Sequence, residues 1–179
     1  MTAVYIDRIA SPLGDLLLAH AGDQLCMLDF EGYESRFDAL LARRFGNIVI
    51  NEKRIASVIH TALLAYMAGE LDALREIPVH SVGTSFQQIV WHTLRTIPSG
   101  ETWSYAQLAN AVGRPGAHRA VGLANAQNPI AIVVPCHRVI GSDGQLTGYA
   151  GGIDRKRWLL SHEGVRLPSE RTLQADLFS

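Results

Sequence analysis

The first 30 residues alternate short apolar runs with turn-forming residues. The turns fall at Ser11-Pro12, Gly14 and Ala21–Asp23, and Gly, Pro, Ser and Asp favour the backbone conformations that tight turns need. Apolar runs of this length between such turns are typical of strands. The pattern therefore predicts two or three antiparallel strands joined by hairpins.

Helical spacing follows the predicted strands. Apolar residues recur every three or four positions over Ser35–Phe45 and again over Ile55–Met67, and Gly69 ends the second pattern. We expect these helices to cover the sheet. His60 lies within the second helical pattern and Cys26 within a predicted strand, so both are expected to be packing residues rather than ligands.

The helical pattern is lost over residues 78–84, where Pro78 and Gly83 occur. Pro and Gly at such a point are typical of a connection between structural units. We therefore expect an N-terminal domain over 1–80, a second domain over 81–168 and a tail over 169–179.

Three helical segments are predicted in the second domain. The first is capped by Thr84 or Ser85, and two shorter ones, Tyr105–Val112 and Ala117–Ala126, flank the turn Gly113–Gly116. Two short helices around a Gly-containing turn outline a helix-turn-helix, although many proteins that never touch DNA contain this arrangement. The apolar face of the first helix is expected to comprise Phe86, Ile89, Val90 and Leu94.

The last of these helices carries mostly small side chains and one long cation. Small residues allow a close backbone approach to a nucleic-acid groove, and Arg119, near the start of the helix, is long enough to enter it. An ion pair on the helix surface is the alternative for Arg119. The small residues are Ala117, Ala120, Gly122 and Ala126.

A five-residue apolar run, Ile130–Val134, precedes Pro135-Cys136-His137-Arg138. The run predicts a short buried strand that Pro135 ends, which places Cys136 at the strand's exit. A proton acceptor and a cation beside a thiol favour the thiolate, which is the nucleophilic form. The alternative is an unreactive buried cysteine, because Cys is among the most buried residue types.

Composition narrows the class of protein. The chain has 179 residues, 47% of them hydrophobic and 18% charged, as in ordinary globular proteins. Its two cysteines lie far apart in a chain without a signal-peptide pattern, which predicts a reducing compartment, the cytoplasm. Every apolar run is far shorter than the roughly 20 residues of a membrane span, so no membrane role is expected.

The net charge of −1 combines two parts of opposite sign. Residues 1–80 hold 7 Lys/Arg and 11 Asp/Glu, whereas residues 113–166 hold 7 and 3. A basic surface of this size predicts modest, salt-sensitive binding to a phosphate backbone. The cluster Arg155-Lys156-Arg157 in this part is expected to be solvated or to lie near phosphate.

Three segments together resemble the O6-alkylguanine-DNA alkyltransferases, the methylated-DNA–protein-cysteine methyltransferases. The segments are Pro135–Arg138, the Arg119 helix and Thr147–Gly152, and the resemblance is most specific over residues 84–165. It implies an α/β (α+β) fold: a small N-terminal antiparallel sheet with helices of RNase H-like type, then a mainly helical, winged-helix-like domain with a helix-turn-helix. It also implies direct-reversal DNA repair, in which the alkyl group of O6-alkylguanine or O4-alkylthymine moves irreversibly to the protein's own cysteine.

The resemblance assigns roles to the residues around the cysteine. Cys136 would accept the alkyl group, His137 would take its proton through a water molecule, and Glu163 would orient His137. Asn128 would brace the turn between the recognition helix and the active-site segment. A carboxylate behind an imidazole behind a thiol is a general arrangement for activating a nucleophile.

The resemblance also implies how DNA is bound. The helix-turn-helix would enter the minor groove, and the damaged nucleotide would be flipped out of the stack, which costs least for a poorly paired base. Tyr105 would push at the target's phosphate and protonate the departing guanine, and Arg119 would fill the gap in the stack.

A lid over the flipped base is implied by the Gly-rich segment. Tyr149 would form an aromatic wall, Ala150 would offer a backbone donor to O6, and the size of the pocket would depend on Gly151. The carbonyls of Cys136 and Val139 would accept from the guanine amino group. Some family members have Ser where this chain has Ala150, which leaves the lesion preference open.

The expected partner is double-stranded DNA that contains alkylated guanine, and the protein is expected to be a monomer in solution, with clustering on DNA left open. No cofactor and no metal site are expected, because Cys26 lacks a nearby Cys or His at metal-ligand spacing. Two other interpretations stay open: a protein that binds lesions without transfer, and a hydrolytic enzyme with a Cys–His pair.

Overall fold

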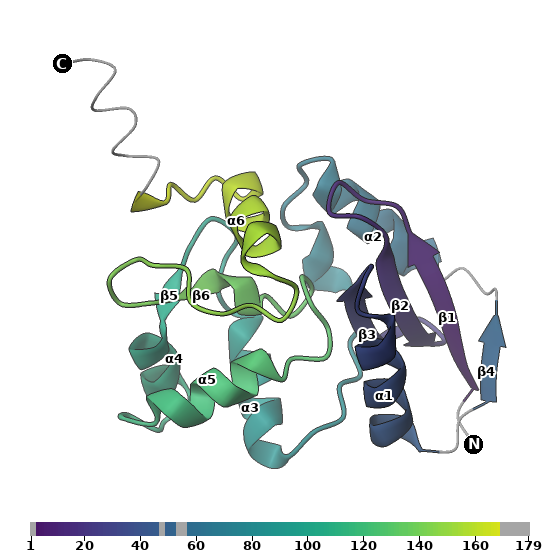
Figure 1. Cartoon of the computed structure of the whole chain (residues 1–179), viewed down its shortest axis with the longest axis horizontal. Coiled ribbons are helices and arrows are strands. Elements are labelled where there is room, and N and C mark those ends of the chain that lie inside the picture. Colours follow the sequence, from purple (N-terminus) through teal and green to yellow (C-terminus); the bar gives the residue numbers. More distant parts are fainter. Residues whose placement is uncertain (1–2, 47–48, 53–56, 169–179) are drawn as a thin grey trace.

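The computed structural model describes residues 3–46, 49–52 and 57–168, which form two adjoining domains (Figure 1). The expected tail, 169–179, lies outside the described residues. The first domain contains a four-stranded sheet in the order β3-β2-β1-β4. Its strands are β1 (Ala3–Ile9), β2 (Leu16–Ala21), β3 (Gln24–Phe30) and β4 (Val49–Glu52).

The predicted hairpins are confirmed, since β1, β2 and β3 pair antiparallel in chain order. The fourth strand, β4, pairs in parallel with β1, which makes the sheet mixed rather than purely antiparallel. The sequence did not predict β4, because a pattern of four residues is too short to recognise.

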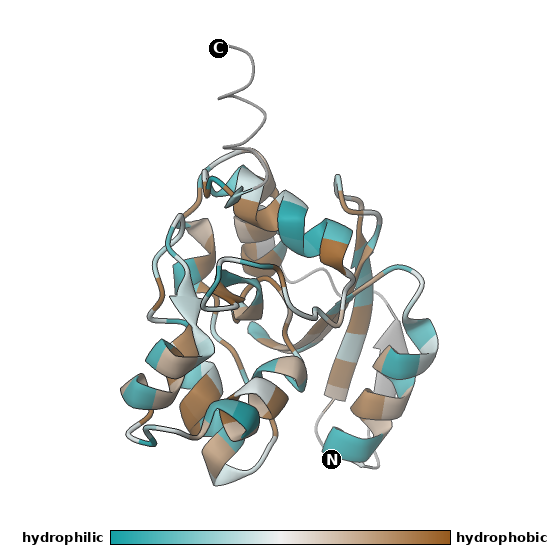
Figure 2. Ribbon diagram, turned by 60° about the vertical axis from the view of Figure 1, so that its left-hand side comes forward, coloured by the Kyte–Doolittle hydropathy of each residue, from teal (hydrophilic) through white to brown (hydrophobic). Residues whose placement is uncertain are grey.

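Two helices cover opposite faces of this sheet (Figure 1). Helix α1 (Glu34–Phe45) buries side chains against the face that carries Leu17 and Ala19, and α2 (Ser57–Met67) packs against the face of Leu16 and Leu18. Neighbouring residues of β2 therefore point to opposite faces, as the pleat of a strand requires. The hydrophobic positions of α1 alternate with hydrophilic ones (Figure 2), which is expected for a helix with one buried side.

The second domain is mainly helical, and it follows a 3₁₀ turn, η1 (Ala73–Glu76). Every helix in the described part of the chain is too short or too polar to cross a membrane. The elements of the second domain are α3 (Ser85–Leu94), β5 (Trp103–Ser104), α4 (Tyr105–Ala111), α5 (His118–Ala126), η2 (Cys136–Arg138), β6 (Val139–Ile140) and α6 (Ile153–His162).

Local sequence sets the starts of two of these helices. Thr84 and Gln87 form a reciprocal capping box at α3, and Ser104 and Gln107 form another at α4, which satisfies backbone donors that a helix start leaves free. The predicted apolar face of α3 is correct at Val90 and Leu94 but wrong at Ile89, whose side chain is exposed. Helices α4 and α5 pack together and confirm the helix-turn-helix outline.

The strand predicted over Ile130–Val134 is wrong. Only Ile130 makes a strand-like bridge, to Leu28 of β3, and the chain then turns back through a hydrogen bond from the Val134 N–H to the Ile130 carbonyl. Ile132 adopts a positive φ of 68° inside this turn. A buried turn and a buried strand have the same apolar composition, so periodicity could not separate them.

Strand β3 joins the two domains. The Leu28 N–H donates to the Pro129 carbonyl, and the Ala131 N–H donates to the Leu28 carbonyl. An open sheet edge exposes unpaired backbone groups, and here the segment before Cys136 covers that edge. The residues around the cysteine are thereby fixed to the first domain.

Candidate active site

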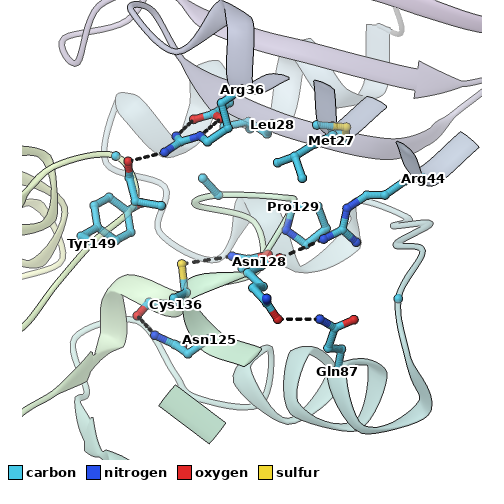
Figure 3. A pocket seen from close by; sticks show the side chains of 18 of the residues that line it. Met27, Leu28, Arg36, Arg44, Gln87, Asn125, Asn128, Pro129, Cys136 and Tyr149 are labelled. Carbon is cyan, nitrogen blue, oxygen red and sulfur yellow. Dashed lines mark hydrogen bonds and ion pairs between the residues drawn. The ribbon is translucent and has the colours of Figure 1, made fainter. Parts of the chain in front are cut away.

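Cys136 opens the 3₁₀ turn η2 and lines a cleft of about 740 Å³ that both domains border. Its side chain is almost fully buried, with 6% of the residue exposed. Met27 and Arg44 line the cleft from the first domain, and Tyr105 and Tyr149 from the second. Figure 3 shows the sulfur pointing toward the amide of Asn128. The thiol is therefore protected from bulk solvent yet borders a space large enough for a ligand.

Asn128 contacts the sulfur directly. Its Nδ2 lies 3.1 Å from the Cys136 Sγ and also donates to the Val134 carbonyl at 2.7 Å. Its Oδ1 accepts from the Ile130 N–H at 3.0 Å. Asn128 thus holds the buried turn closed and aims a donor at the sulfur, and hydrogen bonds to an anion favour its charged form.

A buried histidine follows the cysteine in the sequence and pairs with a buried carboxylate from the end of α6. The His137 Nε2 is 2.9 Å from the Glu163 Oε1, and both side chains are fully buried. The His137 Nδ1 is buried and has no hydrogen-bond partner among the described residues. Burial lowers the pKa of His137 although Glu163 opposes that shift, so the imidazole is neutral at neutral pH.

Glu163 accepts from three side chains. Besides His137, Arg138 donates through Nε and Nη2 at 2.9 Å each, and the Tyr66 hydroxyl donates at 2.7 Å. Burial alone would raise the pKa of Glu163, but the bonds and charges of His137 and Arg138 outweigh it and lower that pKa. Arg138 therefore neutralises the carboxylate, and the expectation that it acts as a cation on the thiol is wrong.

Burial raises the pKa of the Cys136 thiol, and the Asn128 hydrogen bond and the Lys156 charge offset part of that shift. Lys156 is fully buried, and its Nζ donates to the Val139 carbonyl at 2.6 Å and the Thr147 carbonyl at 3.1 Å. Burial lowers the pKa of Lys156 to about 8. The resting site thus combines a neutral thiol, a neutral imidazole, the Arg138–Glu163 ion pair and the buried Lys156 cation.

The basic cluster Arg155-Lys156-Arg157 is not the solvated patch that the sequence suggested. Lys156 is buried, and Arg155 donates to the carbonyls of Leu13 and Glu31 in the first domain. Only Arg157 is exposed. Successive residues of a helix point in different directions, so a run of three cations does not form one face.

Helix α5 lies beside the cleft with its predicted residues in different settings. Gly122 lines the cleft next to the Tyr105 ring, and Ala126 lines it further along. Arg119 and Ala120 are exposed, and Ala117 is half-buried at the start of the helix. The Tyr105 hydroxyl accepts from the Thr147 Oγ1 at 3.2 Å. The helix surface is thus available to a partner while Tyr105 faces the cleft.

The lid residues border the same cleft. Tyr149 packs edge-on against Phe30, and its buried hydroxyl lacks a hydrogen-bond partner among the described residues. A Cβ added to Gly151 would lie 2.4 Å from a Phe30 ring carbon, so only glycine fits there. Val139 does not belong to the described residues that line the cleft, and its carbonyl accepts from Lys156.

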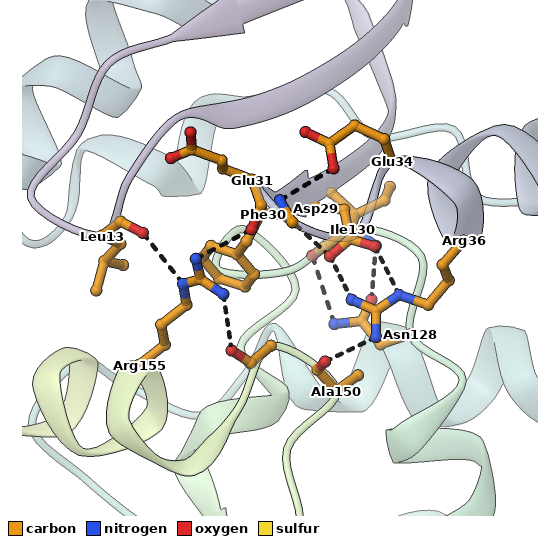
Figure 4. Close-up of polar contacts among 12 residues, drawn as sticks. Leu13, Asp29, Phe30, Glu31, Glu34, Arg36, Asn128, Ile130, Ala150 and Arg155 are labelled. Atoms are coloured by element: carbon orange, nitrogen blue, oxygen red, sulfur yellow. Dashed lines mark hydrogen bonds and ion pairs between the residues drawn. The ribbon is translucent and has the colours of Figure 1, made fainter.

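Two arginines tie the lid to the first domain (Figure 4). Arg36 of α1 binds both carboxylate oxygens of Asp29 and donates to the Ala150 carbonyl at 2.7 Å. Arg155 donates to the Gly151 carbonyl at 3.2 Å and to the Leu13 and Glu31 carbonyls. The position of the lid therefore depends on contacts between the domains.

Sequence reasoning missed Tyr66, Lys156 and Arg36 as parts of the site. Tyr66 lies 97 residues from Glu163, and Arg36 lies 114 residues from Ala150. No local spacing could have related residues so far apart. Within the described ranges, no three His, Cys, Asp or Glu side chains lie close enough together to hold a metal ion.

A helix-turn-helix beside a cleft that holds a cysteine, with a histidine–carboxylate pair behind it, is typical of a DNA-binding protein that uses a cysteine nucleophile. Two family profiles match the chain: the ribonuclease-like domain of 6-O-methylguanine DNA methyltransferase over residues 4–80, and the DNA-binding domain of the same family over residues 85–165. The chain belongs to the 6-O-methylguanine DNA methyltransferase family.

Individual relatives agree with this assignment. A methylated-DNA–protein-cysteine methyltransferase of Shigella flexneri is 46% identical over 166 residues, which cover 90% of this chain and 96% of the relative. The structure of Mycobacterium tuberculosis OGT in complex with DNA superimposes with a TM-score of 0.76 at 44% identity, covering 94% of this chain and 98% of that one. An O6-methylguanine-DNA methyltransferase from Pyrococcus kodakaraensis gives a TM-score of 0.71 at 26% identity, covering 90% and 99%.

Proposed function

We propose that this protein repairs DNA by direct reversal, moving the alkyl group of O6-alkylguanine in duplex DNA irreversibly to Cys136. The observation that carries the proposal is the position of the Cys136 sulfur. It borders a ligand-sized cleft, with the Asn128 amide 3.1 Å away and the His137–Glu163 pair next to it in a buried interior. Each molecule reacts once, because the new thioether has no leaving group.

The chemical step is an in-line displacement at an sp³ carbon. The Cys136 sulfur attacks the alkyl carbon, the S–C bond forms, and the C–O6 bond breaks with its electron pair going to the guanine. The thiol proton passes to the neutral His137 through a water molecule, and Glu163 holds the resulting imidazolium. A fixed carboxylate behind an imidazole is suited to this task because it stabilises the charge that develops.

Proton delivery to the departing guanine is assigned to Tyr105. Its ring borders the cleft near Gly122, and its hydroxyl oxygen accepts from Thr147, which leaves the phenolic proton free to be donated. The leaving base would otherwise depart as an anion. General acid catalysis by a positioned side chain removes that penalty.

DNA binding is assigned to the surface of α5 and to the minor groove. The exposed Arg119 would enter the stack where the damaged nucleotide has left it, and the small side chains of Ala117, Ala120 and Ala126 would allow close approach. A base inside a duplex cannot bring its alkyl carbon to a buried thiol, so the nucleotide must be flipped out. O4-alkylthymine meets the same geometric requirement and is proposed as a second substrate.

The flipped base would lie between Tyr149 and the residues of α5. The Tyr149 hydroxyl and the Asn125 Oδ1 are buried without hydrogen-bond partners among the described residues, and each could pair with a base edge. Ala150 keeps a backbone N–H for O6. The Val139 carbonyl already accepts from Lys156, so its contact with the guanine amino group would share that oxygen.

We further propose that the protein acts as a monomer in the cytoplasm, with 1–80 and 81–168 as its two domains. Both cysteines are free, and a free nucleophilic thiol needs a reducing compartment to stay active.

The test is intact-protein mass spectrometry after incubation with a duplex that contains one O6-methylguanine, followed by peptide mapping. We expect the protein to gain the mass of one CH₂ unit, located on Cys136, with an equal amount of lesion repaired. Cys26→Ala is the matched control and should react normally, whereas Cys136→Ala should not react.

An unmodified protein that still shifts the damaged duplex on a gel would contradict transfer and favour lesion binding alone. Repeated turnover of a thioester or ester substrate without a stable adduct would instead favour the hydrolytic alternative.

A further inference from the structure

Tyr66 of the first domain reaches into the centre of the site in the second. It lies in the last turn of α2, is fully buried, and donates from its hydroxyl to the Glu163 Oε1 at 2.7 Å. This contact is shorter than the 2.9 Å bonds from His137 and Arg138 to the same carboxylate. The first domain thus supplies a hydrogen bond to the group that orients His137.

The two carboxylate oxygens of Glu163 accept different numbers of hydrogen bonds. Oε2 accepts one bond, from the Arg138 Nε, whereas Oε1 accepts from the Arg138 Nη2, His137 and Tyr66. Arg138 holds the carboxylate in a bidentate manner from one side. Tyr66 donates to the same oxygen that His137 contacts, so it restrains Oε1 from tilting about the Arg138 pair.

Tyr66 is held through its backbone as well as through its hydroxyl. Its backbone carbonyl accepts from the His162 Nε2 at 2.7 Å, and the two rings meet edge-on with centroids 5.1 Å apart. His162 in turn stacks on Trp158. Residues 162 and 163 of the second domain are therefore both bonded to the same residue of α2.

The hydroxyl acts only as a donor. Burial and the adjacent Glu163 raise the pKa of Tyr66 far above its ordinary value, so the phenol keeps its proton at neutral pH. A permanent donor on Oε1 shares that oxygen's electron density with His137 and moderates the basicity of the imidazole.

We infer that Tyr66 is a positioning residue for alkyl transfer: its hydroxyl fixes the Glu163 Oε1 against His137 and so sets the geometry and proton affinity of the imidazole. The inference rests on the proposed function, in which His137 receives the thiol proton. It makes the first domain a contributor to the chemistry as well as a structural support for the lid.

Tyr66→Phe tests this, because it removes one oxygen and keeps the ring. We expect the single-turnover transfer rate to fall about tenfold, as for loss of a hydrogen bond to a charged group. We also expect the acidic limb of the pH–rate profile to move upward by roughly half a unit to one unit, because Oε1 then interacts more strongly with His137.

Tyr5→Phe is the matched control. Tyr5 lies in β1 of the same domain and stacks on His20, away from the cleft. Tyr5→Phe also removes one hydroxyl, and it should leave both the transfer rate and its pH profile unchanged. Replacing Tyr66 alone by 3-fluorotyrosine provides a second variant of opposite sign, since a more acidic phenol is a stronger donor and should move the acidic limb downward.

If Tyr66 were merely structural, Tyr66→Phe would have a lower free energy of unfolding but the same pH–rate profile as the wild type. That result would overturn the inference. A slower rate with an unmoved acidic limb would overturn it as well, because general loosening does not change imidazole basicity.

A readout independent of transfer separates this inference from the proposed function. The ¹⁵N chemical shifts of the His137 ring, followed by NMR in labelled protein, should differ between wild type and Tyr66→Phe. If the wild type methylates no cysteine, the proposed function fails, while unchanged His137 shifts in Tyr66→Phe would reject the role of Tyr66.

Discussion

The two cysteines of this protein are both buried, and they differ in what surrounds the sulfur. Cys26 in β3 is 1% exposed, and its Sγ makes a weak 3.6 Å contact with the Gln24 carbonyl. Cys136 is 6% exposed and receives the Asn128 amide at 3.1 Å. Burial raises the thiol pKa of both.

The difference teaches that depth of burial alone does not distinguish the proposed nucleophile, Cys136, from a cysteine that only packs. Cys136 has three features that the described contacts do not give Cys26: a side-chain amide donor at the sulfur, a histidine–carboxylate pair that begins at the next residue, and a position bordering a cleft. A buried thiolate is costly unless such groups offset its desolvation. Each feature can be removed separately.

Removing the donor should have the largest effect. Asn128→Ala deletes the hydrogen bond to the sulfur and the bond that closes the turn at Val134. A hydrogen bond to a charged group contributes about 1.5–3 kcal/mol, so transfer should slow by roughly 10- to 100-fold. The measurement is the single-turnover rate on a duplex with one O6-methylguanine. Gln24→Ala, at an exposed amide residue outside the described lining of the cleft, is the control, and equal rates for both variants would refute the role of Asn128.

The second-largest effect on transfer should come from adding a side chain at Gly151, which lines the cleft. Gly151→Ala would place a Cβ 2.4 Å from Phe30 and 2.9 Å from Tyr149, and overpacking of this kind costs about 1–3 kcal/mol. We expect a lower free energy of unfolding in urea and slower transfer from duplex DNA. Gly122→Ala is the stability control, since its nearest contact would be an ordinary 3.6 Å. If Gly151→Ala unfolds like the wild type, the lid is looser than described.

Weakening the contact between Arg36 of the first domain and the segment around Ala150 should reduce the transfer rate less. Arg36→Lys keeps the charge but cannot bind both Asp29 oxygens and the Ala150 carbonyl together. Loss of about 1 kcal/mol from these bonds predicts transfer slower by roughly fivefold. Arg8→Lys, at an exposed ion pair with Glu34, should react at the wild-type rate. An unaffected Arg36→Lys would show that the lid holds its position without the first domain.

The pH dependence should show the smallest change. Because the pKa of His137 is lowered below its ordinary value of 6.5, the neutral base persists as pH falls through 6.5, and the transfer rate should hold there. An unfolded peptide carrying Cys136 should instead lose reactivity toward an alkylating reagent in proportion to its thiolate fraction. A transfer rate that declines in parallel with the peptide would mean that His137 is not the base.

Much of the fold was predictable because local signals specify it. The hairpins of the first domain follow from turn residues, and α3 begins at Thr84 because a side-chain cap satisfies its first donors. The turn before Cys136 was mistaken for a strand, since an apolar run that is buried on all sides has no period to distinguish the two.

The site was only half predictable for a related reason. Cys136, His137 and Glu163 were placed through the family resemblance, which depends on short motifs. Arg138 was expected to face the thiol, yet it binds Glu163, because adjacency in sequence does not determine where a side chain points. Tyr66 and Arg36 reach the site from another domain, and only the folded chain brings them there.

The turn at Ile132 combines a strained backbone with a buried side chain. A β-branched residue with a φ of 68° is held in a conformation that costs of order 1–3 kcal/mol, which glycine would avoid. Yet Ile132 is fully buried, and deleting such a side chain costs about 2–5 kcal/mol through the cavity it leaves. Glycine at this position would therefore exchange one defect for another. Its gain in backbone freedom would be offset by an empty space in the core directly behind Cys136, so the strained turn is retained together with the side chain that fills it.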